Sequence, residues 1–277
     1  MNLLFLPREQ SGPEPSWGVL VIGHGTTDPV GAAETRAVAA QVAADDPTMA
    51  VELAFLELLE PSIDTALERL HVRGFRDVIA APLLLFPAGH ARRDVPAALA
   101  AAAKRLGSRV VQADPLGVHP AIVALAAHRR QEAVGSRGPV AVADTIDVVV
   151  GRGASDGGAL SRLGELVAAI DRHRGGAHAL RTEFGFVAAS RPTVAEALER
   201  AAADRPRRIV VQPHLLFSGR VEQDVEAAVA TARAGHPEIE WVLVSRLGAD
   251  PLVAEALQAR IAAAGPLPTG DMPSPLP

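Results

Sequence analysis

The chain has 277 residues, of which 48% are hydrophobic and 21% are charged, and its formal net charge is −5. This length predicts about two domains, each large enough to bury a core. The acidic balance argues against a nucleic-acid partner, because such proteins usually carry a basic excess. The absence of cysteine excludes disulfides, thiolate metal sites and a cysteine nucleophile, so histidine, aspartate and glutamate remain as the strong metal ligands.

No segment approaches the roughly 18 uninterrupted apolar residues of a membrane span. Residues 1–16 lack the basic start and the long apolar run of a secretory signal peptide. We therefore expect a cytoplasmic protein with no membrane partner.

Apolar runs typical of buried parallel strands alternate with amphipathic stretches typical of helices in the first half of the chain. Strands are expected at residues 18–22, 51–56, 78–85 and 109–113, and helices at 32–44, 63–73, 95–106 and 121–134. This alternation predicts an α/β fold in which right-handed crossovers connect a parallel sheet.

The same rhythm returns after a linker at residues 135–139. Strands are expected at 146–150, 180–188, 208–217 and 241–245, and helices at 160–172, 194–203, 221–234 and 252–263. Residues 1–16 and the Pro-rich residues 264–277 are expected to be disordered tails.

Matching motifs indicate that the two halves are copies of one module. Pro82-Leu-Leu-Leu-Phe86 aligns with Pro213-His-Leu-Leu-Phe217, and Leu116-Gly117 aligns with Leu247-Gly248. A repeat period of about 130 residues is too long for a solenoid unit and predicts two pseudo-symmetric domains. Their expected bounds are 17–134 and 139–263, each a parallel sheet flanked by helices.

Three chemically capable residues follow successive strands of the first half. His24, Glu57 and His90 fall at the carboxyl ends of these strands, where open parallel sheets bind ligands. Two imidazoles and a carboxylate suit a divalent ion such as Fe, Co or Ni, and the same groups can accept protons near neutral pH. In the second half, Arg152 and Arg220 stand where the first half has these two histidines.

Less specific interpretations apply to some of these residues. A loop histidine is commonly just solvated, and Glu57 could favour a helix start. Asp28 and its counterpart Asp156 are better explained as turn or capping residues. The motif around Gly23 does not complete a phosphate loop, and Gly23 stands where a histidine phosphatase would need arginine. His119 and His214 have no matching histidine in the other half and receive no role.

Four motifs together resemble the class II chelatases, which insert Co or Fe into sirohydrochlorin for cobalamin or sirohaem biosynthesis. The motifs are Val21-Ile-Gly-His-Gly-Thr-Thr-Asp-Pro29, Ala54-Phe-Leu-Glu57 with Glu60-Pro-Ser62, Pro82-Leu-Leu-Leu85 with Gly89-His90 and Asp94-Val-Pro96, and Leu116-Gly117 with His119-Pro120. The resemblance covers residues 17–263 in a two-module long form.

The resemblance implies that His24 and His90 are the catalytic, metal-binding pair, and that Glu57 is the acidic residue of the second motif. The metal would be a substrate, with Fe²⁺ and Co²⁺ as the first candidates and Ni²⁺ as a third, and no organic cofactor is implied. Since sirohydrochlorin carries eight carboxylates, Arg152 and Arg220 are expected to bind it. The fused repeat is expected to make the protein a monomer.

Two alternatives remain at this stage. One is a non-catalytic carrier of metal or tetrapyrrole, and the other is a histidine-phosphatase-like enzyme. The chain also lacks the cysteine-bound cluster and the histidine-rich stretch of some long cobaltochelatases, which favours the ferrochelatase branch.

Overall fold

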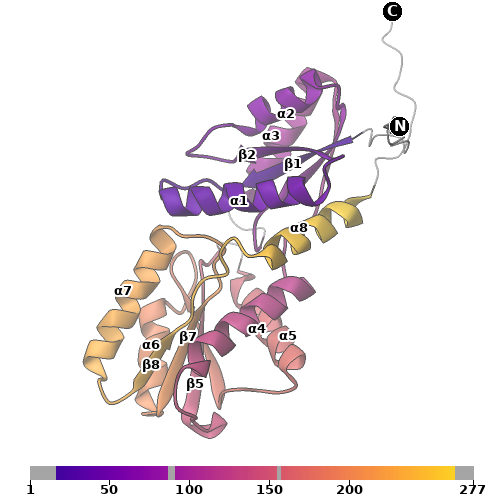
Figure 1. Ribbon diagram of the computed structural model, residues 1–277. Coiled ribbons are helices and arrows are strands. Elements are labelled where there is room, and N and C mark those ends of the chain that lie inside the picture. Colours follow the sequence, from indigo (N-terminus) through magenta and orange to yellow (C-terminus); the bar gives the residue numbers. More distant parts are fainter. Residues whose placement is uncertain (1–16, 87–90, 155–156, 266–277) are drawn as a thin grey trace, which may run out of the picture.

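The structure is a computed structural model that describes residues 17–86, 91–154 and 157–265 (Figure 1). Of Ala91 and Arg92 only the backbone is described. Among the described helices, none is long and apolar enough to cross a membrane.

The first half forms a four-stranded parallel sheet with the strand order β2-β1-β3-β4. Its strands are β1 (Trp17–Gly23), β2 (Ala50–Phe55), β3 (Asp77–Pro82) and β4 (Arg109–Gln112). From Gly18 onward every residue of β1 is buried, as expected for a central parallel strand that is covered on both faces.

The second half repeats this sheet with the order β6-β5-β7-β8. Its strands are β5 (Thr145–Gly151), β6 (Arg181–Phe186), β7 (Arg208–Pro213) and β8 (Glu240–Leu243). The register agrees as well, because Ile22 pairs with Pro82 in one sheet and Val150 pairs with Pro213 in the other. The predicted fold class, two similar α/β units related by pseudo-symmetry, is confirmed.

Helices follow the strands as the sequence predicts. They are α1 (Pro29–Asp45), α2 (Ile63–Val72), α3 (Ala91–Leu106), α4 (Pro120–Gly135), α5 (Ala159–Arg174), α6 (Val194–Ala203), α7 (Arg220–Gly235) and α8 (Pro251–Ala264). The capping role predicted for Asp28 is confirmed, since its carboxylate accepts hydrogen bonds from the backbone N–H groups of Val30 and Gly31. Asp156 lies outside the described residues.

Several strands end earlier than the sequence pattern predicts, and β3 and β7 do so by the most residues. β3 ends at Pro82 and β7 at Pro213, whereas the apolar runs continue to residues 85 and 217. Proline has no N–H to donate to a neighbouring strand. The apolar residues that follow leave the sheets and line a cavity between them.

The last helix of each repeat packs against the sheet of the other repeat. α4 contacts α5 and β8 of the second half, whereas α8 contacts α1 and β3 of the first half. Figure 1 shows α8, in yellow, lying beside α1, in indigo. Hydrogen bonds fix this exchange: Gln212 on β7 donates to the carbonyl of Ala126 on α4 at 2.8 Å, and Arg260 on α8 donates to the carbonyl of Leu116 at 2.9 Å.

The packing of α4 and α8 on the opposite repeats makes one continuous core out of the two halves. A single buried cluster includes Val21 and Ile79 of the first sheet, Leu163 of α5 and Leu257 of α8. The other face of each sheet has its own separate cluster, such as the one around Leu198 on α6. The two sheets are therefore held in a fixed relation by packing and not only by the linker.

Replacing Leu257 tests this arrangement. The side chain is fully buried, so Leu257→Ala should lower the free energy of unfolding by about 2–5 kcal/mol. Because α8 covers the first sheet, amide hydrogen exchange should speed up in β1 and β3 before it does in β5. The matched control, Leu198→Ala, should weaken β5 and β7 instead. Unchanged protection of β1 and β3 in the Leu257 variant would contradict the packing of α8 on the first sheet.

Candidate functional site

A cavity of about 430 Å³ lies between the carboxyl ends of the two sheets. His24 and Glu57 line it from the first half, and Arg152 and Arg220 line it from the second. Apolar side chains such as Leu83 form part of its wall. Its size and its mixed lining are typical of small-molecule sites, and parallel sheets bind ligands at this edge.

The loop after β1 brings His24 beside Glu57. The backbone N–H of Glu57 donates to the carbonyl of His24 at 3.1 Å, so the loops after β1 and β2 are in direct contact. Gly25 makes this approach feasible: its φ is +96°, and a Cβ placed there would lie 1.8 Å from the Glu57 carbonyl oxygen. The local backbone therefore sets the two side chains next to each other.

Arg152, His24 and Glu57 form a polar chain across the cavity. The Nη1 of Arg152 lies 3.0 Å from the Nε2 of His24, and the Nδ1 of His24 lies 3.3 Å from the Oε1 of Glu57. Because a guanidinium can only donate, Nε2 must be the accepting nitrogen. The ring proton of neutral His24 then sits on Nδ1, facing the carboxylate, and the lone pair on Nε2 faces the cavity and Arg152.

The second half contains the same backbone with different side chains. The N–H of Ala188 donates to the carbonyl of Arg152 at 2.9 Å, as Glu57 does to His24. Gly153 has a φ of +92° and meets the Ala188 carbonyl as Gly25 meets that of Glu57. Arg152 and Ala188 thus occupy the places of His24 and Glu57, so the second half lacks both the imidazole and the carboxylate here.

Arg220 lies at the start of α7 on the rim of the cavity. Its side chain is 85% exposed, and its Nε donates to Asp224 at 2.9 Å. An exposed ion pair of this kind contributes less than about 1 kcal/mol. Arg220 can therefore exchange its partner for the carboxylate of a ligand at little cost.

The second predicted histidine, His90, lies outside the described residues together with Gly89. Within residues 17–86, 91–154 and 157–265, no cluster of three or more His, Asp or Glu side chains is placed to hold a metal. The structure thus brings His24, Glu57 and Arg152 together and places Arg220 at the rim of the same cavity.

His214 is a cavity residue to which the sequence alone assigns no role. It follows β7 at the position where the first half has Leu83, and both residues donate their N–H to the central strand, to Val150 and Ile22 respectively. Its ring packs beside Phe86, with centroids 5.5 Å apart, and its Nε2 is buried with no hydrogen-bond partner among the described residues. Burial lowers the pKa of His214 from 6.5 to about 4, so the ring is neutral at neutral pH.

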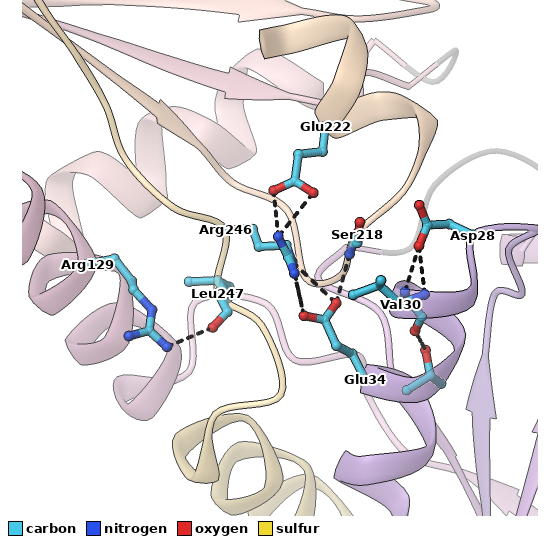
Figure 2. A network of polar contacts seen from close by, with 10 residues as sticks. Asp28, Val30, Glu34, Arg129, Ser218, Glu222, Arg246 and Leu247 are labelled. Carbon is cyan, nitrogen blue, oxygen red and sulfur yellow. Dashed lines mark hydrogen bonds and ion pairs between the residues drawn. The ribbon is translucent and has the colours of Figure 1, made fainter.

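An ion-pair network ties the cavity wall of the second half to the first half (Figure 2). Arg246 donates to Glu34 on α1 at 2.6 Å and to Glu222 on α7 at 2.9 Å. Glu34 in turn accepts the backbone N–H of Ser218, which lines the cavity, at 2.8 Å. These carboxylates hold the pKa of Arg246 above its ordinary value, and the network fixes the loop after β7.

His119 is a capping residue. Its Nδ1 accepts the N–H of Ala121 at the start of α4, and the matching residue Asp250 accepts the N–H of Leu252 at the start of α8. The repeat alignment pairs these two positions, and this pairing is the sequence signal that identifies the cap.

The fold and the site define a class: a two-repeat α/β protein whose ligand cavity lies between the carboxyl edges of its two parallel sheets. The profile of the CbiX family matches residues 18–133 and again residues 147–264. The chain therefore belongs to the CbiX family, in a form that carries two copies of its domain.

Named relatives share most of the chain. A sirohydrochlorin cobaltochelatase of Priestia megaterium is 29% identical over 244 residues, which cover 87% of this chain and 78% of the relative. A sirohydrochlorin ferrochelatase of Bacillus subtilis is 28% identical over 251 residues, which cover 88% of this chain and 90% of the relative. The solved structure of SirB from Bacillus subtilis with Fe³⁺ matches with a TM-score of 0.76 at 26% identity, covering 90% of this chain and 95% of SirB.

The buried imidazole of His214 predicts a specific loss of stability in acid. Its folded pKa of about 4 lies below the ordinary 6.5, so the unfolded chain binds this proton more readily. The associated stability is complete above pH 6.5 and is lost as the pH falls toward 4. Between pH 7.5 and pH 5, His214 should cost the folded state about 2 kcal/mol.

Urea unfolding of the wild type and of His214→Leu at both pH values measures this contribution. Leucine occupies the equivalent position in the first half, so the variant keeps an apolar side chain of similar size there. The wild type should lose more stability than the variant between the two pH values. Equal losses would show that the ring is not held neutral.

Proposed function

We propose that this protein is a sirohydrochlorin chelatase, a metal-ion lyase that inserts Fe²⁺ or Co²⁺ into the tetrapyrrole for sirohaem or cobalamin biosynthesis. The observation that carries the proposal is His24, whose Nε2 lone pair faces the cavity while Glu57 holds the opposite ring nitrogen. The relatives named as cobaltochelatase and ferrochelatase support the substrate and the reaction.

Insertion replaces two pyrrole N–H protons of the macrocycle by one divalent ion and releases both protons. The catalyst therefore needs a proton acceptor and a metal-delivering group at one face of the ring. A neutral imidazole with its proton fixed on the far nitrogen can serve either purpose. Glu57 stabilises the positive charge that His24 gains when it accepts a proton. It also orients the ring, as carboxylates do when they accept a hydrogen bond from a metal-binding histidine. His90 is proposed as the second imidazole of this pair.

The arginines of the second half are proposed to hold the substrate. Guanidinium groups bind carboxylates with two parallel hydrogen bonds, and sirohydrochlorin carries eight carboxylates. Since Arg152 and Arg220 line the cavity that His24 lines from the other half, the macrocycle would lie between the two repeats. The cytoplasmic location and the monomeric state expected from the sequence belong to the same proposal.

Anaerobic incubation with sirohydrochlorin and each metal in turn tests the function, with the absorption spectrum of the macrocycle as the readout. An enzyme converts many equivalents of sirohydrochlorin per chain. Conversion that stops at one equivalent would indicate a carrier and overturn the proposal.

Removing His24 should abolish most of the activity. His24→Ala is expected to lower the insertion rate at least about 100-fold, the scale of a lost acid–base group, and His90→Ala is expected to do the same. The His24 side chain is part-exposed in a loop, so the variant should fold normally. His128→Ala, which removes an exposed histidine on α4, is the control and should keep full activity. Near-normal turnover of the two site variants with both metals would rule out this assignment.

Removing Arg220 should weaken binding and leave the chemistry intact. Arg220→Ala is expected to raise KM about tenfold with little change in kcat, because one charge-assisted contact is lost equally from the ground state and the transition state. The control is Asp224→Ala, which leaves Arg220 in place without its partner and should not raise KM. A drop in kcat at unchanged KM in the Arg220 variant would count against a binding role.

A further inference from the structure

We propose that Arg152 keeps the metal-accepting nitrogen of His24 closed until a carboxylate of the tetrapyrrole draws the guanidinium away. This inference rests on the proposed function and adds an order to it: macrocycle first, metal second. It assigns to the second repeat control over the metal ligand of the first.

The geometry places Arg152 on the atom that a metal would need. Its Nη1 lies 3.0 Å from Nε2 of His24, while Glu57 lies at Nδ1 on the other side of the ring. Since the guanidinium always donates, this contact uses the one lone pair that neutral His24 offers to the cavity. An incoming divalent ion must therefore displace Arg152 before it can bind Nε2.

Charge adds to this block. A divalent ion at Nε2 would stand a few ångströms from a guanidinium that does not lose its proton in proteins, and like charges at this distance repel. With Arg152 in place, His24 is a poor metal ligand both because its lone pair is occupied and because a positive charge lies next to it.

A tetrapyrrole carboxylate is the natural group to remove the block. A carboxylate binds guanidinium through two charge-assisted hydrogen bonds, whereas the neutral imidazole offers one acceptor. Arg152 is itself exposed, in the loop after β5, and it lines the same cavity as His24. A carboxylate of the macrocycle can thus bind the guanidinium of Arg152 without disturbing Glu57. Glu57 stays beside Nδ1, and the lone pair of Nε2 becomes available to the metal.

Metal binding in the absence of tetrapyrrole tests the first half of the inference. Co²⁺ affinity is measured by competition with a chromophoric chelator for the wild type, Arg152→Met and Arg220→Met. Methionine keeps the apolar stem and removes the donor. Arg152→Met should bind Co²⁺ about tenfold more tightly than the wild type, the scale of one charge-assisted hydrogen bond.

Two controls separate this contact from general effects. Arg220→Met removes the same charge from the same cavity but no contact with His24, so its affinity should rise much less. In the double variant His24→Ala with Arg152→Met, the gain should vanish, because it acts through His24. Equal Co²⁺ affinities of Arg152→Met and the wild type, or equal gains in both arginine variants, would overturn the inference.

The ¹⁵N NMR signal of the His24 ring tests the second half, with uroporphyrin I as an octacarboxylate probe. Binding of the probe should move the Nε2 signal of the wild type toward its position in Arg152→Met and leave that variant nearly unchanged. A bound probe that does not shift the wild-type signal would refute the release step. These readouts need no turnover, so their failure alongside an inactive His24→Ala would refute the coupling and leave the chelatase function standing.

Discussion

The reciprocal packing of α4 and α8 is the constraint on which the site depends. Each helix covers the sheet of the opposite repeat, so the carboxyl edges of the two sheets are held facing each other across one cavity. The ion pairs of Arg246 with Glu34 and Glu222 reinforce this relation at the cavity wall. Without this packing, a residue of the second repeat such as Arg152 would not be held within hydrogen-bond distance of His24.

The two repeats share one backbone arrangement but present different side chains to the cavity. Strand order, glycine conformation and the hydrogen bonds after the strands agree in both halves. The side chains at equivalent positions differ: His24 and Glu57 of the first half correspond to Arg152 and Ala188 of the second. The first half therefore presents an imidazole–carboxylate pair, and the second presents guanidinium groups suited to an anionic ligand.

Local sequence patterns predicted the fold well, because strands buried on both faces and capped amphipathic helices carry strong local signals. The helix at Val194–Ala203 has the bounds that the sequence predicts, and Asp28 caps α1 as expected. β3 and β7 end early at Pro82 and Pro213. The sequence pattern places these ends too late because apolar residues continue beyond both prolines.

The exchange of the final helices could not be predicted in this way. Repeats with similar apolar faces give α4 and α8 two sheets to pack on, and only the three-dimensional packing decides between them. The same limit applies to the contact between Arg152 and His24, which joins residues 128 positions apart. The burial of His214, in contrast, has a signal in the repeat alignment, because the equivalent position in the first half holds the apolar residue Leu83.

The proposed role of His24 is to bind the metal inside the cavity between the repeats. X-ray absorption at the cobalt edge tests this role on full chains loaded with one equivalent of Co²⁺, in the Arg152→Met background that leaves Nε2 of His24 open. Imidazole scattering should appear in Arg152→Met and in Arg152→Met with His214→Leu, and it should weaken when His24→Ala is added to Arg152→Met. Identical spectra of Arg152→Met with and without His24→Ala would show that the metal binds elsewhere.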